Sequence, residues 1–201
     1  MEIEFDNNKI RFNKVLNNLD KFTINFTKIL DKLNIKYVII SGYVAILFGR
    51  SRNSEDVDII IDRVDENKFT ELWSELYKSG FECILCDTSE FAFKDYISIN
   101  ERLRFAKTNT FIPNMEIKVY SESIDKWVLD NSIEVIFNNN SIFISNIELQ
   151  IAYKLYLSSE KDIEDARYLY KLFIDNIKLN ELDKWVEKLN VKNVFKRYLL
   201  W

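Results

Sequence analysis

The fold is decided by one stretch of the sequence, Ser41-Gly42-Tyr43-Val44-Ala45-Ile46-Leu47-Phe48-Gly49-Arg50-Ser51-Arg52-Asn53-Ser54-Glu55-Asp56-Val57-Asp58-Ile59-Ile60-Ile61. A β-branched run at residues 36–40 precedes it and predicts a buried strand. We expect this strand to end in a small-residue turn, followed by a short helix over 44–48 that stops at Gly49. After a basic loop at 50–54, residues 57–61 predict a second strand.

Two features of this stretch suit phosphate chemistry. Free backbone amides at the Ser41-Gly42 turn and the dipole of the following helix would form a phosphate site, and Gly42 allows close approach. Asp56 and Asp58 begin an apolar strand one residue apart, so both carboxylates lie on one face and can share a divalent cation. Each feature alone fits an ordinary turn or a solvated strand start. Together, with a basic loop between them, they favour phosphoryl or nucleotidyl transfer.

This pattern resembles the nucleotidyltransferase signature of the DNA polymerase beta-like superfamily. It is most similar to the AbiEii-type toxin nucleotidyltransferases and their uncharacterised relatives, whose first motifs are approximately G-G-x-A and G-x-x-R-x-T-x-D-h-D, with h apolar. The matching residues are Gly42, Ala45, Gly49, Arg52, Ser54, Asp56 and Asp58. That family continues with K-L and with R/K-D-x-x-D, which are matched by Lys154-Leu155 and by Lys161-Asp162-Ile163-Glu164-Asp165.

The resemblance implies a metal site built from carboxylates. Asp56 and Asp58 would bind one or two Mg²⁺ or Mn²⁺ ions, and a neighbouring strand would add a third carboxylate. The best candidate is Glu116, which would complete the metal pair or act as general base. An exposed Glu-Lys pair on a strand is the alternative for Glu116, and Asp95 or Glu90 could take its place under another strand order.

The same resemblance assigns nucleotide-binding residues to the turn and the loop. Ser41 and Gly42 would cradle the β- and γ-phosphates, and Ser54 stands at the hydroxyl position of the second motif. Arg52, with Arg50 beside it, would compensate charge on the leaving pyrophosphate, for which a guanidinium fork is suited.

Two residues of the later motifs complete the catalytic set. Lys154 would approach the triphosphate, and Asp162 would position Lys154 or the acceptor. Asp162 and Asp165 share one helix face, although acids in a first helical turn are also favoured by the helix dipole. One residue departs from the family pattern: Tyr43 follows Gly42 where a small or hydroxyl residue is usual, and would crowd the triphosphate or stack on a base or acceptor.

Composition limits the chemistry further. The 201 residues include 28 basic and 32 acidic side chains, for a formal net charge of -4, and no histidine. Without histidine there is no Ser-His-Asp or Cys-His catalysis and no His-ligated zinc, so an oxygen-ligated metal is expected. The C-x-x-C string of Cys83 and Cys86 predicts two free thiols on opposite faces of a strand over 81–86, because no second pair exists to complete a zinc site.

The remaining pattern predicts an α/β (α+β) fold: a small mixed β-sheet nucleotidyltransferase core flanked by helices, with a C-terminal helical part. We expect an N-terminal helix packed on the core within 1–35, with helical periodicity over 7–34, a core over 36–145 and a helical region over 146–201. No run approaches about 18 apolar residues and the N-terminus lacks signal-peptide features, so we expect a cytoplasmic protein without membrane association.

The functional hypothesis is therefore a Mg²⁺-dependent nucleotidyltransferase that transfers a nucleoside monophosphate from a nucleoside triphosphate to a hydroxyl of tRNA or protein. By resemblance it would be the toxin of a toxin-antitoxin system, with an antitoxin protein as partner. The alternatives are a degenerate, non-catalytic protein that binds a nucleotide or partner, and an aminoglycoside-type adenylyltransferase. A basic rim would favour an RNA acceptor, although ordinary solvated faces explain the same residues: Arg102, Arg104, Lys107, Lys192, Lys196 and Arg197.

Overall fold

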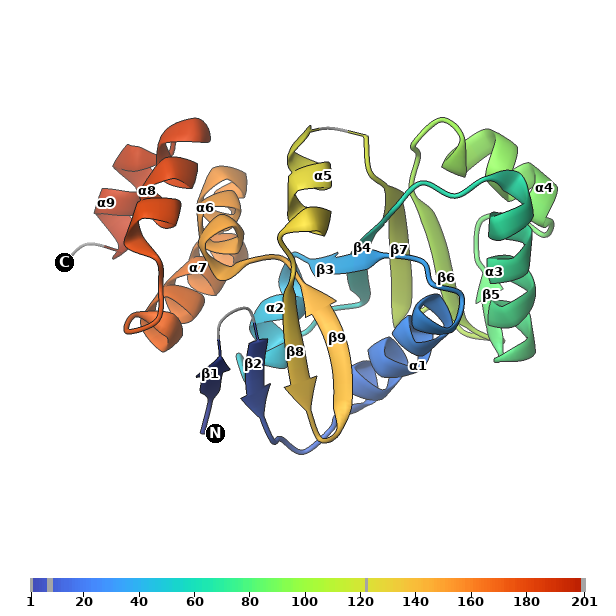
Figure 1. Cartoon of the computed structure of the whole chain (residues 1–201), viewed down its shortest axis with the longest axis horizontal. Coiled ribbons are helices and arrows are strands. Elements are labelled where there is room, and N and C mark those ends of the chain that lie inside the picture. Colours follow the sequence, from blue (N-terminus) through green and yellow to red (C-terminus); the bar gives the residue numbers. More distant parts are fainter. Residues whose placement is uncertain (1, 7–8, 122, 200–201) are drawn as a thin grey trace.

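The computed structural model describes residues 2–6, 9–121 and 123–199 (Figure 1). Within these ranges the strands form one mixed sheet in the order β1-β2-β8-β9-β3-β4-β7-β6-β5. Helices lie on both faces of this sheet, and the chain ends in a group of helices at one end of the molecule (Figure 1). The predicted class, a mixed sheet flanked by helices with a helical C-terminal part, is confirmed.

The strands of the sheet are β1 Glu4–Asp6, β2 Lys9–Phe12, β3 Tyr37–Ile40, β4 Asp56–Ile61, β5 Phe81–Cys83, β6 Leu103–Lys107, β7 Asn114–Val119, β8 Ile133–Phe137 and β9 Asn140–Ile144. The helices are α1 Asn18–Lys32, α2 Gly42–Leu47, α3 Glu66–Lys78, α4 Ser89–Ala92, the π-helical turn η1 Phe93–Ile97, α5 Ser123–Asp130, α6 Ile147–Leu157, α7 Glu160–Phe173, α8 Leu179–Lys188 and α9 Lys192–Leu199. Three of these, β3, α2 and β4, lie within two residues of the ranges 36–40, 44–48 and 57–61 that the sequence predicts.

Strand β4 lies next to the central strand of the sheet, β3, and pairs antiparallel with it and parallel with β7. Its side chains alternate between the two faces, so the apolar residues Val57, Ile59 and Ile61 share one face and are fully or almost fully buried. On that face α1 covers β5 and β6, where Phe26 lies edge-on to Phe81 with ring centroids 5.1 Å apart. The opposite face therefore carries the acidic residues of β4.

The N-terminal segment differs from its prediction. Residues Lys9–Phe12 form a strand that pairs in parallel with β8, so the expected helix over 7–34 is wrong for this part. Ile10 and Phe12 are buried while Lys9 is exposed, a two-residue alternation too short to stand out from the helical pattern that follows it. The helix itself begins after Asn17, whose side chain forms a capping box with Asp20.

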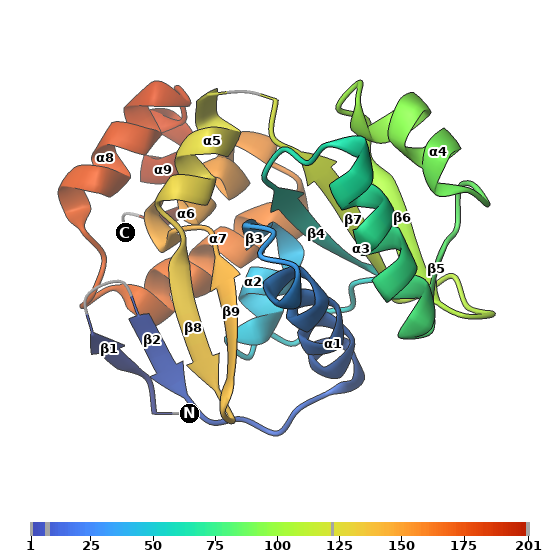
Figure 2. The ribbon, with the colours of Figure 1, turned by 45° about the vertical axis from the view of Figure 1, so that its right-hand side comes forward.

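The C-terminal helices pack on one another and on the core. Tyr168 of α7 donates a hydrogen bond to the carbonyl of Phe48 (2.9 Å). The ring of Phe173 lies edge-on to the ring of Phe48, with centroids 4.8 Å apart. These contacts join α7 to the end of α2, and Figure 2 shows α6 and α7 beside α2.

The domain boundaries at 35/36 and 145/146 stay predictions. In the part of the chain that the structure describes, no helix combines the length and hydropathy needed to cross a membrane.

The two cysteines are free thiols, as expected, but their placement differs from the prediction. Strand β5 ends at Cys83, and the following bend brings Sγ of Cys86 within 3.5 Å of Sγ of Cys83. The expectation of opposite faces was wrong because it assumed a strand that continues through residue 86. Burial, followed by the neighbouring Cys83, raises the pKa of the Cys86 thiol to about 12.

Candidate active site

Three of the predicted carboxylates lie on one face of the sheet. Asp58 is the register partner of Glu116 across the parallel pair β4–β7, and Asp56 precedes Asp58 on the same face. Burial, followed by the charges of Asp56 and Glu116, raises the pKa of Asp58 to about 6. The sheet thus brings Asp56 and Glu116 onto the face of Asp58, as the sequence alternation predicts, and close enough to disfavour the ionisation of Asp58.

Glu116, however, is already paired with cations. Arg104, its partner on β6, donates from Nε at 2.8 Å and from Nη2 at 2.6 Å to one carboxylate oxygen, and Arg102 donates to the other. Burial alone would raise the pKa of Glu116, but the two arginines hold it below its usual value. Among residues 2–6, 9–121 and 123–199, no three acidic or cysteine side chains form a ready metal site. Glu116 therefore faces arginines here, and its metal role stays a prediction.

The Ser41-Gly42 turn is fixed from the C-terminal helices. Gln150 of α6 donates to the Ser41 carbonyl at 2.6 Å and accepts from the Ser41 amide at 3.3 Å, so this amide is not free as expected. Ser41 has φ 64°, in the left-handed region, and the hydrogen bonds from Gln150 help hold it there. A hydroxyl contact from Ser41 lowers the pKa of Asp58, against the larger upward effect of burial.

Gly42 is needed because of Arg52. A Cβ atom at Gly42 would lie 3.0 to 3.1 Å from the guanidinium atoms of Arg52, closer than side chains normally approach. The predicted phosphate-binding arginine therefore lies directly over the predicted phosphate-binding glycine. The helix that follows, α2, has only six residues, so its dipole is small and Arg52 is the main positive group at this turn.

A buried acid anchors the basic loop. Asp165 of α7 has 0% exposure and accepts from both Arg50 and Arg52, while Nζ of Lys154 lies 3.1 Å from it. Lys154 is 2% exposed and donates to Asp162 at 2.6 Å. Burial acts to raise the pKa of Asp162, but Lys154 and Ser159 lower it below its usual value. Helices α6 and α7 thus hold the two arginines that the sequence assigns to the triphosphate.

This network also shows what sequence reasoning missed. Lys154 lies buried with its Nζ between Asp162 and Asp165, which fits the role of Asp162 in positioning Lys154. Asp165 has the largest number of cationic partners, although only its place in the D-x-x-D string marks it. Nothing in the local sequence marks Gln150 as the residue that binds the turn.

Ser54 contacts Asp56 of the candidate site, whereas Tyr43 lies in the core. The hydroxyl of Ser54 donates to the Asp56 carbonyl at 3.0 Å and lies 3.3 Å from its carboxylate, so it orients Asp56. Tyr43 is fully buried and donates to Asp20 at 2.9 Å. Tyr43 therefore points into the core, and the expectation that it crowds the triphosphate or stacks on a base was wrong.

The three residues of the predicted basic rim at and beside β6 have intramolecular partners. Arg102 and Arg104 bind Glu116, as described above. Lys107 donates to the Ser79 carbonyl at 2.9 Å and lies 3.5 Å above the ring of Phe81. The residues of the rim on β6 are thus engaged in intramolecular contacts, which weakens the case for an RNA-binding surface there.

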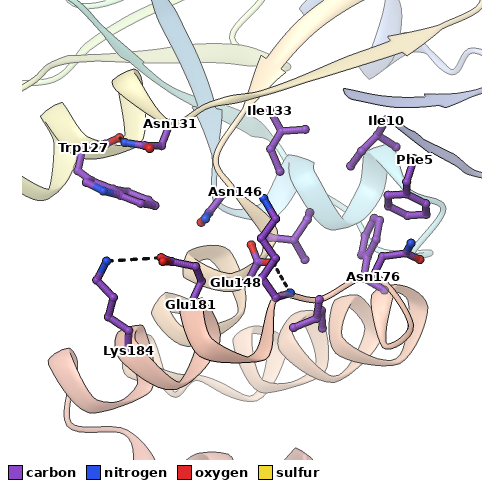
Figure 3. A pocket seen from close by; sticks show the side chains of 14 residues that line it. Phe5, Ile10, Trp127, Asn131, Ile133, Asn146, Glu148, Asn176, Glu181 and Lys184 are labelled. Carbon is purple, nitrogen blue, oxygen red and sulfur yellow. Dashed lines mark hydrogen bonds and ion pairs between the residues drawn. The ribbon is translucent and has the colours of Figure 1, made fainter. Parts of the chain in front are cut away.

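Two cavities lie near the C-terminal helices. One, of about 330 Å³, opens beside Ser41 between α5 and α6 and is lined by Ile60, Arg102 and Tyr153 among others. The second, of about 420 Å³, lies between β1–β2, α5 and the C-terminal helices (Figure 3). Its acids are engaged: Glu148 accepts from the Lys178 amide at 2.8 Å, and Glu181 pairs with Lys184. Only the first cavity adjoins predicted site residues.

The chain has the nucleotidyltransferase fold, as its motifs predict. It resembles the crystal structure of an antigenic nucleotidyltransferase-like protein from Paracoccidioides brasiliensis, with 21% identity, a TM-score of 0.50, and coverage of 88% of this chain and 91% of that one. It also resembles ANT(2")-Ia in complex with adenylyl-2"-tobramycin (11% identity, TM-score 0.52, coverage 86% and 97%). It also resembles the lincomycin-bound lincosamide antibiotic adenylyltransferase LnuA, with 16% identity, a TM-score of 0.50, and coverage of 78% of this chain and 98% of that one.

No protein-family model and no curated protein matches the sequence. The structural likenesses support the superfamily-level fold and not the AbiEii-type toxins in particular. That closer relationship stays a prediction of the sequence motifs.

Proposed function

We propose that this chain is a nucleotidyltransferase that transfers a nucleoside monophosphate from a nucleoside triphosphate to an acceptor hydroxyl. One observation carries the proposal: Asp56, Asp58 and Glu116 lie on one face of adjacent strands, beside the turn that Arg52 covers. Carboxylates next to a positively charged turn are the arrangement that transfer from a triphosphate needs. The nucleotidyltransferase fold and the structures that share it support the same activity.

The donor set of this site fits Mg²⁺ or Mn²⁺. Asp56 and Asp58 present hard oxygen ligands on one face, and burial, followed by the charge of Asp56, raises the pKa of Asp58, a cost that a bound divalent cation would remove. Glu116 would join them only if it left Arg102 or Arg104. A metal bound here would neutralise phosphate charge and organise in-line attack.

The chain's own residues would do the rest. Arg52 and Arg50, held by Asp165, would bind the β- and γ-phosphates at the Ser41-Gly42 turn. Glu116, kept ionised by its arginines, would accept the proton of the acceptor hydroxyl only after leaving one of them, because the same contacts occupy its oxygens and lower its pKa. Lys154 and Asp162 are positioning residues, because both are buried in the network that holds Asp165.

The acceptor is less defined. Tyrosines and a single acid line the cavity beside the site, so we favour an acceptor other than an aminoglycoside, whose cationic rings would need an acidic pocket. A tRNA or protein acceptor, and a toxin role with an antitoxin partner, stay predictions of the sequence resemblance.

A labelling assay tests the proposal. Purified protein with Mg²⁺ and each of the four α-labelled nucleoside triphosphates should label tRNA, a protein or itself. Asp56→Asn and Asp58→Asn should each abolish labelling while far-UV circular dichroism stays unchanged. Asp62→Asn, one residue beyond β4, is the matched control and should label normally. If Asp58→Asn labels like the wild type, the metal-dependent enzyme is the wrong interpretation.

A further inference from the structure

The cavity beside Ser41 continues the face that carries the carboxylates. Along β4, Asp56, Asp58 and Ile60 share one face, and along β7 Glu116 and Lys118 share it with them. Ile60 and Lys118 line the cavity, which therefore begins where the row of carboxylates ends. A group bound in this cavity would lie directly beside anything held by Asp56 and Asp58.

Two tyrosines of α6 form the outer wall of this cavity. Tyr153 and Tyr156 are 39% and 56% exposed, and their ring centroids lie 5.8 Å apart with planes inclined by 35°. Ile60 on the sheet and Leu149 on α6 add apolar surface, and Ile124 and Val128 of α5 line the other side. The volume, about 330 Å³, lies at the small end of the range typical of small-molecule sites.

The charges of the cavity argue against a polycation. Its charged lining residues are Arg102, Lys118 and Asp125, and Lys118 pairs with Asp125 at 2.8 Å. Arg102 stands at the boundary of the cavity, where burial lowers its pKa but the charge and hydrogen bond of Glu116, with a further contribution from Asp58, raise it above its usual value. A cationic ligand would therefore meet a net positive wall, whereas a planar aromatic group would find tyrosine rings and apolar side chains.

We propose that this cavity binds a nucleobase, stacked on Tyr153 and Tyr156, next to the carboxylates of β4. The inference rests on the proposed function, and it goes further by naming the residues and the chemistry that select the substrate. Stacking is tolerant of base identity because every base has a π face, so the site favours bases as a class. The base can belong to the nucleoside triphosphate or to the 3′ end of an RNA acceptor.

Isothermal titration calorimetry with three probes separates these sources. The probes are Mg²⁺ with inorganic triphosphate, Mg²⁺ with an α,β-methylene nucleoside triphosphate, and a single-stranded RNA trinucleotide. The variant Tyr153→Ala/Tyr156→Ala removes the stacking surface, and Tyr153→Phe/Tyr156→Phe keeps it. Tyr77→Ala is the matched control, because Tyr77 is 38% exposed on α3, outside the cavity.

We expect the double alanine variant to bind the nucleotide, or the trinucleotide, about 10- to 100-fold more weakly. Inorganic triphosphate should bind this variant as it binds the wild type, and the phenylalanine and Tyr77→Ala variants should bind all three probes normally. A loss confined to the nucleotide assigns the base to the donor, and a loss confined to the trinucleotide assigns it to the acceptor.

Three results would overturn the inference. The first is unchanged affinity of the double alanine variant for both base-containing probes. The second is an equal loss for inorganic triphosphate, which would mean a general disruption of the site. The third is Tyr-dependent binding of tobramycin, used as a polycation. None of these depends on the labelling assay, so a chain that binds bases through the tyrosines but labels nothing would refute only the proposed function.

Discussion

Asp165→Asn should destabilise the protein strongly, because this buried carboxylate forms ion pairs with three cationic side chains. Asp165 is 0% exposed and pairs with Arg50, Arg52 and Lys154. Lys154 is itself only 2% exposed, so it cannot regain water when its partner is lost. Asparagine has nearly the same shape as aspartate, so the change removes a charge without opening a cavity.

The magnitude follows from the burial of the group. Removing one partner of a buried ion pair typically costs about 3 to 5 kcal/mol, because the other charge stays buried and uncompensated. At roughly 2 to 4 °C per kcal/mol for a chain of this size, the melting temperature should fall by roughly 6 to 20 °C. Asp162 still contacts Lys154 and can offset part of this loss, which favours the lower half of the range.

Urea unfolding followed by tryptophan fluorescence measures this effect, with Glu164→Gln as the matched control. Glu164 is the preceding residue of α7, but it is exposed and pairs only with a neighbour on the same helix, Arg167, among the ion pairs described. Surface pairs of this kind contribute about 0.3 to 0.5 kcal/mol. Lys154→Met combined with Asp165→Asn should recover part of the stability, because the orphaned cation is then absent. If Asp165→Asn costs no more than Glu164→Gln, the buried network does not hold the C-terminal helices to the core.

Two further predictions concern the turn at Gly42 and the loss of stability at acid pH. Gly42→Ala should weaken the binding of Mg²⁺-triphosphate about tenfold, because the new methyl group displaces the guanidinium of Arg52. The melting temperature should change little. In an Arg52→Ala background, the Gly42→Ala change should have little further effect on binding. Asp162 has a folded-state pKa below its usual 3.8, so its stabilising effect is complete above that value and is lost as pH falls through the folded pKa. Asp162→Asn should therefore flatten the fall of unfolding free energy below about pH 4, which acid titrations of urea midpoints would detect.

The sequence predicts the centre of this fold well because its signals there are local. The apolar run of β3, the turn at Gly42 and the alternation of Asp56 and Asp58 each follow from neighbouring residues. The strand Lys9–Phe12 was missed because its partner, β8, begins at Ile133, more than a hundred residues later. A four-residue strand is defined by such a pairing and not by its own composition.

The site shows the same division between local and distant information. Alternation correctly places Asp58 and Glu116 on one face, because register across β4 and β7 preserves it. It could not show that Arg102 and Arg104 would reach Glu116, or that Asp165 would bind the loop arginines, since those contacts depend on how separate elements pack. Tyr43 is the clearest example. Its position in the motif suggested that it contacts the bound nucleotide or acceptor, but its hydrogen bond to Asp20 of α1 places it in the core.

The distribution of charge around the site is the strongest argument for a metal-dependent enzyme over a protein that only binds a partner. In the described ranges, the cations near the turn and the sheet face pair with Glu116 and Asp165, while burial and the charges of Asp56 and Glu116 raise the pKa of Asp58 more than nearby Arg102 lowers it. At neutral pH two adjacent carboxylates against an apolar strand cost free energy unless a cation compensates them. A binding-only protein would bear that cost without compensation, whereas a bound Mg²⁺ would remove it and, under the proposed function, would lie beside the turn that Arg52 covers.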